Sequence, residues 1–281
     1  MDDVPYARLL LSGLLAMSLG ACEPADARCF AVDTVLPTRA EVLASPSLGG
    51  SGRDLAEALL DRDGAHAKRL LDADPALARL TVGRDHDMLT VAIASCDPAL
   101  VSLLLDHGAA ADGVQPGLPL DLALRADDPE LAFRLLKGGA HPNPSGHPTG
   151  PLRTAIELNS LGGVRMLLDF HADPNAMESN GRRPLHIALD TEHFRIAELL
   201  LDRGADPWAV DHGGANLGSA LVAPMVTRAP EEDAARRRLL ARLPQIGWPQ
   251  PVPGFADVRK LSAEGHWPPP HAMHLGQQHE R

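Results

Sequence analysis

Residues 181–209 read GRRPLHIALDTEHFRIAELLLDRGADPWA and contain two amphipathic helical patterns in direct succession. In the first, the apolar residues of 185–189 fall on one side of a short helix, and Pro184 stands at its start, where no backbone N–H partner is lost. The second pattern covers 196–201 and stops before Gly204, which can take positive φ without a Cβ penalty. The stretch therefore predicts two short helices and a capped turn.

The same unit recurs along the chain. The first helix of each unit carries a leucine marker that advances by 34, 31, 32 and 33 residues: Leu55, Leu89, Leu120, Leu152 and Leu185. The second helix carries a leucine pair that advances by the same four steps, starting from Leu70-Leu71 and ending at Leu200-Leu201. Two markers that drift together indicate an internal repeat, because chance alignment would not give equal steps in both.

This repeat resembles the ankyrin repeat, whose pattern is roughly G-x-T-P-L-H-x-A-A, then G-H, then I-V-x-L-L-L-x-x-G-A-D-x-N. Departures within 181–209 are Arg183 for Thr, Glu192 for Gly and Trp208 for Asn. In the preceding unit His171 replaces the capping glycine, so we expect it to take positive φ at a modest cost. The matching residues are Gly181, Pro184, Leu185, His186, Ala188, His193, Ile196, Leu199, Leu200, Leu201, Gly204, Ala205 and Asp206.

The resemblance implies an all-α solenoid of about five to six helix–turn–helix units with short hairpin loops, in which each unit is stabilised by its neighbours. We assign residues 53–243 to this domain. The first unit, 53–77, is truncated like a capping repeat, and 234–243 is predicted as the last second helix. On that helix a charge run is predicted to form the solvated outer side: Arg236, Arg237, Arg238 and Arg242.

Beyond the repeats, residues 244–281 are rich in Pro and His and are predicted not to continue as helix. An extended strap anchored by Trp248 or Trp267 and plain disorder are the two alternatives. The tail histidines do not have the spacing of a closed metal site, so we interpret them as incidental composition rather than ligands: His266, His271, His274 and His279.

The N-terminal residues 1–21 resemble a bacterial lipoprotein signal peptide. An apolar run over 9–19, too short to span a bilayer, ends in Leu-Gly-Ala before Cys22. In that family this cysteine is diacylated and becomes the new N-terminus, and two acyl chains anchor a protein stably. Residues 22–52 lack a sustained period and are predicted to be a flexible tether. The alternative is a buried N-terminal helix of a cytoplasmic protein.

Two further cysteines remain once Cys22 is set aside. The remaining cysteines, Cys29 and Cys96, are even in number, and the periplasm would be an oxidising compartment. A disulfide between them is therefore one expectation. Two free thiols packed as small apolar side chains are the other. The sequence leaves both open, because it does not show whether the two Cα atoms come close enough.

Composition and charge restrict the function. Hydrophobic residues make up 44% and aromatic residues only 3%, which suits stacked short helices. A formal charge of −11 with little clustered Lys or Arg argues against nucleic acid and favours a basic or polar partner. No nucleophile elbow, phosphate-binding loop, dinucleotide fingerprint or zinc-protease motif occurs, so we expect no catalysis and no cofactor.

Function is therefore expected where the resemblance places it, on the hairpin tips and the exposed ends of the first helices. His186 is assigned a structural role. The same pattern also predicts tip and helix-end positions at Gly117, Gly214, Ala94, Ser95, Ala126 and Leu158. The predicted partner-binding residues are Gln115, Arg125, His147, Thr149, Glu157, Ser179, Asn180, Arg182, Asp190, Thr191 and His212.

The combined prediction is a monomeric, lipid-anchored adaptor or inhibitor that faces the periplasm of a Gram-negative bacterium and binds another protein. An immunity protein that occludes a secreted antibacterial toxin is one specific hypothesis. A cytoplasmic scaffold with an uncleaved N-terminal helix and a metal- or redox-related envelope protein are the alternatives.

Overall fold

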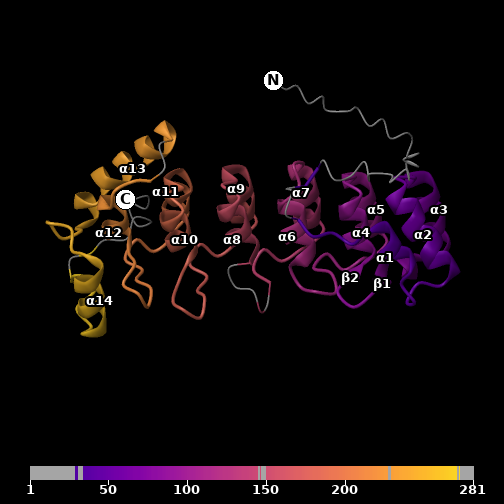
Figure 1. Cartoon of the computed structure of the whole chain (residues 1–281), viewed down its shortest axis with the longest axis horizontal. Helices are drawn as coiled ribbons and strands as arrows, with labels where there is room; N and C mark the ends of the chain where they lie inside the picture. The colour runs from indigo at the N-terminus through magenta and orange to yellow at the C-terminus, as the bar shows by residue number, and fades with distance from the viewer. Residues whose placement is uncertain are drawn as a thin grey trace, which may run out of the picture.

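In this computed structural model, the described residues are 29–30, 34–144, 146, 150–226, 229–270 and 272. They form helix pairs stacked side by side into one elongated array (Figure 1). The first helices are α2 (Gly50–Leu60), α4 (Met88–Ala94), α6 (Leu118–Leu124), α8 (Gly150–Glu157), α10 (Pro184–Asp190) and α12 (Leu217–Val222). The second helices are α3 (Gly64–Ala73), α5 (Pro98–Asp106), α7 (Pro129–Lys137), α9 (Leu161–Asp169), α11 (Phe194–Asp202) and α13 (Pro230–Arg242).

These pairs, numbered here as units one to six, confirm the predicted all-α solenoid. The first helices lie on the side of the hairpin loops and the second helices on the opposite side (Figure 1). We call the surface of first helices and hairpin loops the inner face, and that of second helices the outer face. A short 3-10 helix, η2 (Pro75–Arg79), and a two-stranded hairpin, β1 (Thr81–Val82) with β2 (His86–Asp87), connect units one and two.

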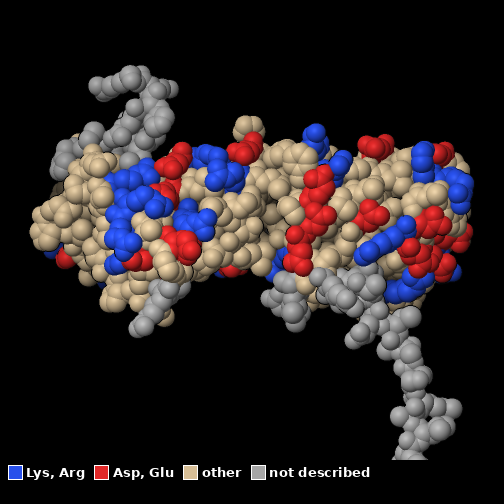
Figure 2. Space-filling view, turned by 90° about the horizontal axis from the view of Figure 1, so that it is seen from above, with Lys and Arg blue, Asp and Glu red and all other residues tan. Residues whose placement is uncertain are grey.

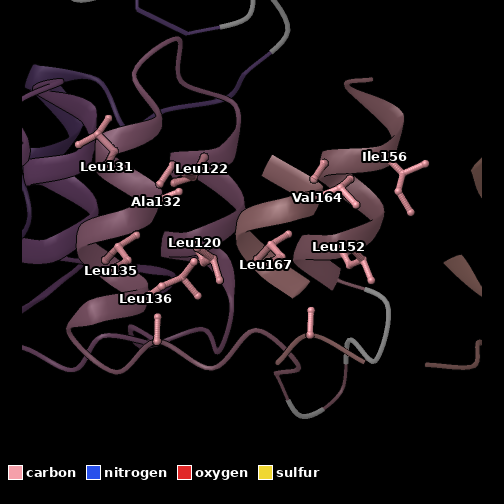
Figure 3. Packing of buried hydrophobic residues seen from close by; sticks show 14 of the residues in the cluster. Leu120, Leu122, Leu131, Ala132, Leu135, Leu136, Leu152, Ile156, Val164 and Leu167 are labelled. Carbon is pink, nitrogen blue, oxygen red and sulfur yellow. The ribbon is translucent and has the colours of Figure 1, made fainter. Parts of the chain in front are cut away.

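The helices begin and pack as their residue types dictate. Asp63, Asp97, Asp128 and Ser160 precede second helices, and each side chain accepts a hydrogen bond from a first-turn backbone N–H. Between the two layers, leucines fill the core: Leu120, Leu131, Leu135 and Leu167 are at most 1% exposed. Figure 3 shows them packed together with Leu122 and Leu152 across units three and four. Each unit thus buries its apolar side against its neighbours.

Side-chain amides join consecutive hairpin loops into a ladder. Asn143 Nδ2 donates to the His171 carbonyl at 3.0 Å, and its Oδ1 accepts from Asp173 N at 2.8 Å. One unit later Asn175 repeats both bonds, with the carbonyl of Gly204 and the backbone N–H of Asp206, each at 2.8 Å. The ladder fixes the spacing of the loops and therefore the shape of the inner face.

Trp208 stands at the next ladder position and ends it. Its ring stacks on Trp248 with centroids 4.6 Å apart, and Trp267 packs edge-on against both. The Trp267 indole N–H donates to the Trp208 carbonyl at 3.0 Å. This cluster anchors the C-terminal residues on unit six, which favours the predicted strap over disorder for 244–270.

Part of that C-terminal stretch is nevertheless helical, which corrects our prediction. η3 (Pro244–Ile246) and α14 (Phe255–Ala263) follow α13. In α14 the apolar Val258 is fully buried, and the Pro-rich residues on both sides do not enter the helix. Of the tail histidines, only His266 lies within the described residues.

The prediction of a flexible tether over 22–52 is wrong for its second half. α1 (Arg39–Leu43) begins with a capping box in which Thr38 and Glu41 exchange hydrogen bonds. Val42 is fully buried and Leu48 is 4% exposed, so this segment packs on unit one. α2 begins at Gly50, three residues before the predicted domain boundary. The predicted signal peptide and Cys22 lie outside the described residues.

Among the helices that the structure describes, none is long and apolar enough to cross a membrane. Within the same residues, no group of three or more His, Cys, Asp or Glu side chains is placed to hold a metal ion.

Candidate protein-binding surface

A groove of about 700 Å³ opens on the inner face between the hairpin loops that precede α6 and α8. Gln115 and Gly117 line it from the first loop, and Pro144 and Gly146 from the second. Its floor consists of side chains from the two helices: Asp121, Arg125, Arg153, Thr154 and Glu157. The structure therefore brings together three predicted residues, Gln115, Arg125 and Glu157.

Arginine–carboxylate pairs line the inner face through units three to five. Arg125 Nε lies 3.1 Å from Asp121 Oδ2, and Arg153 Nε lies 2.8 Å from Glu157 Oε1. Both are i,i+4 pairs on their helix. In unit five, Arg182 in the hairpin reaches Asp190 of α10 at 2.5 Å. The surface thus carries charges of both signs side by side.

Neighbouring units share some of these groups. Arg153 of α8 also pairs with Glu178, which belongs to the hairpin loop of unit five. The Glu178 carboxylate raises the pKa of the Arg153 guanidinium, so this arginine stays charged at any relevant pH. Thr154 donates its hydroxyl to Asp121 of unit three. These contacts hold the charged groups in fixed positions relative to one another.

The other predicted residues lie at hairpin tips or at the end of a first helix. Ser179, Asn180 and His212 are exposed, and His212 N donates to the Asn180 carbonyl at 3.2 Å, which joins two neighbouring tips. Thr191 is exposed at the end of α10, and its hydroxyl donates to the Ile187 carbonyl. The predicted His147 and Thr149 lie outside the described residues.

Three of the predicted positions are not available to a partner, which corrects that part of the prediction. Ala94 is 7% exposed and Ser95 is fully buried, with its hydroxyl bonded to the Ala92 carbonyl. Gly214 is covered by α14, since a Cβ there would lie 2.5 Å from the Phe255 carbonyl oxygen. Small residues at repeat positions can thus mark close packing as readily as an open surface.

The N-terminal residues 29 and 30, which we call the clamp, lie across the ends of the first helices in units two and three. Cys29 is bonded to Cys96 in a disulfide with Cα atoms 6.5 Å apart, one of the two alternatives left open by the sequence. Phe30 is 7% exposed and forms an antiparallel bridge with Ala126. Asp127 N donates to the Cys29 carbonyl at 2.7 Å. The clamp therefore occupies part of the inner face.

Sequence reasoning missed Phe30, Asp121, Arg153 and Glu178. The i,i+4 spacing of Arg153 with Glu157 was a usable signal for two of the groove's charges. Phe30 gave no such signal, because it stands in an aperiodic segment whose position depends on a disulfide.

His186 has the structural role that the sequence suggested. It is 2% exposed, its Nδ1 accepts from Arg183 N at 3.0 Å, and its Nε2 faces the Ala209 carbonyl at 3.3 Å. Burial lowers the pKa of this imidazole, although Asp211 and the backbone carbonyls partly oppose the shift. The side chain therefore joins consecutive units as a neutral group.

The basic residues over α11 and α13 on the outer face gather at one end of the molecule (Figure 2). Arg238 donates twice to Glu198 of α11, at 2.8 and 2.6 Å, and Arg242 pairs with Asp202 at 2.9 Å. Arg236 is half-buried and donates to the Leu221 and Ala223 carbonyls at the end of α12. Arg238 and Arg242 thus connect unit six to unit five, and Arg236 joins the two helices of unit six, rather than all of them forming only the solvated side that we predicted.

The comparisons with known proteins agree with this geometry. The family model described as ankyrin repeats matches residues 120–211 in three copies. Over these residues the sequence is similar to that of ankyrin repeats. The solved ankyrin repeat domain of Bcl-3, of the IkappaB protein family, superposes with a TM-score of 0.53 at 21% identity and covers 67% of this chain and 85% of that one. This likeness shows the fold.

Curated relatives match over the same type of repeat. An ankyrin repeat-containing protein of Treponema pallidum is 34% identical over 119 residues, which is 41% of this chain and 40% of that protein. Cyclin-dependent kinase 4 inhibitor B of Mus musculus is 36% identical over 92 residues, 33% of this chain and 61% of the inhibitor. The chain thus spans less than two thirds of the length of these relatives. What they share with it is a run of similar repeats.

Proposed function

We propose that the inner face of units three to five binds a protein partner, with the groove between the α6 and α8 hairpins at its centre. The observation that carries this proposal is the set of Arg–carboxylate pairs on that face around an open groove. Solenoids present such extended faces to their partners. On the outer face, Arg236 of α13 is half-buried against the Leu221 and Ala223 carbonyls, so its guanidinium is not open to a partner.

The chemistry of the inner face selects a polar, charged partner surface. Arg153 and Glu157 have side chains that are each 44% exposed, so both can exchange their intramolecular pair for an intermolecular one. The net charge of −11 adds a long-range attraction for a basic partner. Binding of this kind is weakened by salt, because exposed charges are screened within about 10 Å at 0.1 M ionic strength.

Affinity capture with matched variants tests the proposal. Full-length protein is used to capture partners from an envelope extract, alongside Arg125→Ala, Arg153→Ala and the outer-face control Arg165→Ala, whose residue is exposed on α9. We expect the two groove variants to lose at least about tenfold in affinity, since truncating an anchoring arginine costs about 2 kcal/mol. Equal loss in the Arg165 variant, or none in the groove variants, would contradict it.

We also propose that the chain is a lipoprotein that acts in the periplasm, anchored to the outer membrane through Cys22. The disulfide between Cys29 and Cys96 supports an oxidising compartment. It also limits how far Cys22 can lie from the repeats, because seven peptide steps separate Cys22 from Cys29, a reach of at most about 25 Å. Units two and three would therefore be held near the bilayer.

Mass spectrometry of the mature protein tests the anchor. We expect a chain that begins at Cys22 and carries diacylglycerol. A chain that still contains residues 1–21 would support the cytoplasmic scaffold instead.

A specific form of the proposed function is an immunity protein that occludes a secreted antibacterial toxin. It is supported by the Leu-Gly-Ala sequence before Cys22, by the acidic net charge, and by an open inner face that could cover the active site of a toxin. The toxin encoded by a neighbouring gene serves as bait for the purified protein. A complex at micromolar concentration is expected, and its absence would rule out this form while leaving binding to another partner open.

A further inference from the structure

The clamp is fastened to the repeats at three points. The disulfide joins Cys29 to Cys96, the Phe30 side chain enters the buried core, and Asp127 N donates to the Cys29 carbonyl at 2.7 Å. Both cysteines are only partly buried, so a reductant can reach them. Ala126, which pairs with Phe30, directly follows Arg125 of the groove.

We propose that the Cys29–Cys96 disulfide is a redox-controlled latch that holds the clamp over the ends of the first helices of units two and three. Without the disulfide, the contacts that hold the clamp in place are the buried Phe30 side chain and the backbone bridge to Ala126 and Asp127. The backbone entropy that is lost when the clamp is ordered opposes these contacts. The solenoid does not depend on the clamp in the same way, because its leucines are buried between neighbouring units.

The step is a thiol–disulfide exchange with a dithiol reductant. A thiolate of the dithiol attacks one sulfur of the Cys29–Cys96 bond and forms a mixed disulfide, and the released cysteine takes up a proton. The second thiolate of the dithiol then attacks the mixed disulfide, which leaves Cys29 and Cys96 as thiols and the reductant as a disulfide. Two electrons pass from the dithiol to the protein.

Release of the clamp uncovers Ala126, which directly follows Arg125 of the groove, and so enlarges the open part of the inner face at units two and three. This consequence bears on the proposed function, but the latch itself does not require a partner.

Hydrogen exchange of the full chain, oxidised and then reduced with a dithiol, tests the latch. The backbone amide of Asp127 is the reporter, because its bond to the Cys29 carbonyl exists only when the clamp is in place. We expect reduction to accelerate its exchange at least about tenfold, which corresponds to the loss of one hydrogen bond. The amides inside α7 and α9 keep their protection.

Matched variants sharpen the result. Cys29→Ser should exchange at Asp127 like reduced wild-type protein under oxidising conditions. Val35→Ala, at an apolar residue that is 86% exposed and lies outside the clamp, should behave like wild type in both states. Unchanged protection at Asp127 on reduction would overturn the proposal, because the clamp would then be held by Phe30. Loss of protection throughout α7 and α9 would also overturn it, because the disulfide would then be a staple of the whole fold.

Discussion

His186 contributes to stability as a buried, neutral side chain. Its Nδ1 accepts a hydrogen bond from Arg183 N, so the Nε2 that faces the Ala209 carbonyl carries the proton. Burial lowers the pKa of this imidazole in the folded state below its ordinary value near 6.5. The unfolded chain therefore takes up a proton at a higher pH than the folded one, and stability is lost as the pH falls below about 6.5.

We predict that the free energy of unfolding falls between pH 7 and pH 5, with a contribution from His186 of at most about 1.4 kcal/mol per pH unit. His186→Asn removes this contribution, whereas His212→Asn, at an exposed hairpin tip, serves as the control for losing a histidine. Urea unfolding at several pH values measures the slope. Identical slopes in wild type and His186→Asn would contradict the assignment.

His171 shows how a departure from the repeat pattern is tolerated. It takes a φ of 68°, as predicted for a residue in the place of the capping glycine. Gly204 occupies the equivalent position one unit later with a φ of 92° and has nothing within 4 Å of an added Cβ. The two sites therefore differ in backbone strain and not in packing.

Reciprocal substitutions test this strain. His171→Gly should raise the free energy of unfolding by about 0.5–1 kcal/mol, because the left-handed conformation penalises a Cβ and the gain exceeds the entropy cost of glycine. Gly204→Ala should lower it by about 1 kcal/mol. Thermal unfolding of both variants measures these changes in stability. A loss of stability in His171→Gly would contradict the account.

At the scale of elements, the side-chain ladder sets how neighbouring hairpin loops are spaced. Asn175 bonds both a carbonyl and an N–H of the next loop, and Asn143 does the same one unit earlier. Trp208 ends the ladder and begins the tryptophan cluster that holds the C-terminal strap. The substitution of Trp208 for the usual Asn thus marks the end of the ladder.

We predict that Asn175→Ala costs about 1–3 kcal/mol of unfolding free energy, since two hydrogen bonds are lost. Asn175→Asp keeps the acceptor for Asp206 N but loses the donor to the Gly204 carbonyl, so it should cost about half as much. Chemical denaturation measures both. Equal effects of the two substitutions would show that the donor alone matters.

The periodic elements could be predicted from sequence, and the aperiodic ones could not. Leucine markers such as Leu120 and Leu152 located the first helices, because one apolar stripe must face the neighbouring unit. α1 was not predicted, because a five-residue helix with one buried residue, Val42, shows no hydrophobic period. α14 was not predicted, because it has one buried residue, Val258, and prolines lie on both sides of it in the sequence.

The candidate site was predictable in part for a related reason. Arg125 and Glu157 followed from the repeat register, which fixes what faces the groove. Glu178 reaches Arg153 from the next unit, and Phe30 arrives from a segment outside the repeats. Contacts between units that are not part of the repeated pattern depend on the assembled solenoid.

At the scale of the whole molecule, the two ends of the array differ in what covers them. The clamp lies on the inner face of units two and three, and α14 with the tryptophan cluster covers unit six. The open inner face is therefore centred on units three to five, between these two covers. This arrangement directs a partner to the groove and to the hairpin tips beside it.

The central claim is that a partner contacts the inner face at this groove. A photoreactive amino acid placed at position 157 in the groove is compared with one at position 165 on the outer face of the same unit; both native side chains are exposed. Irradiation in the presence of the captured partner should give a covalent adduct from position 157 and none from position 165. An adduct from position 165 with none from position 157 would contradict the account.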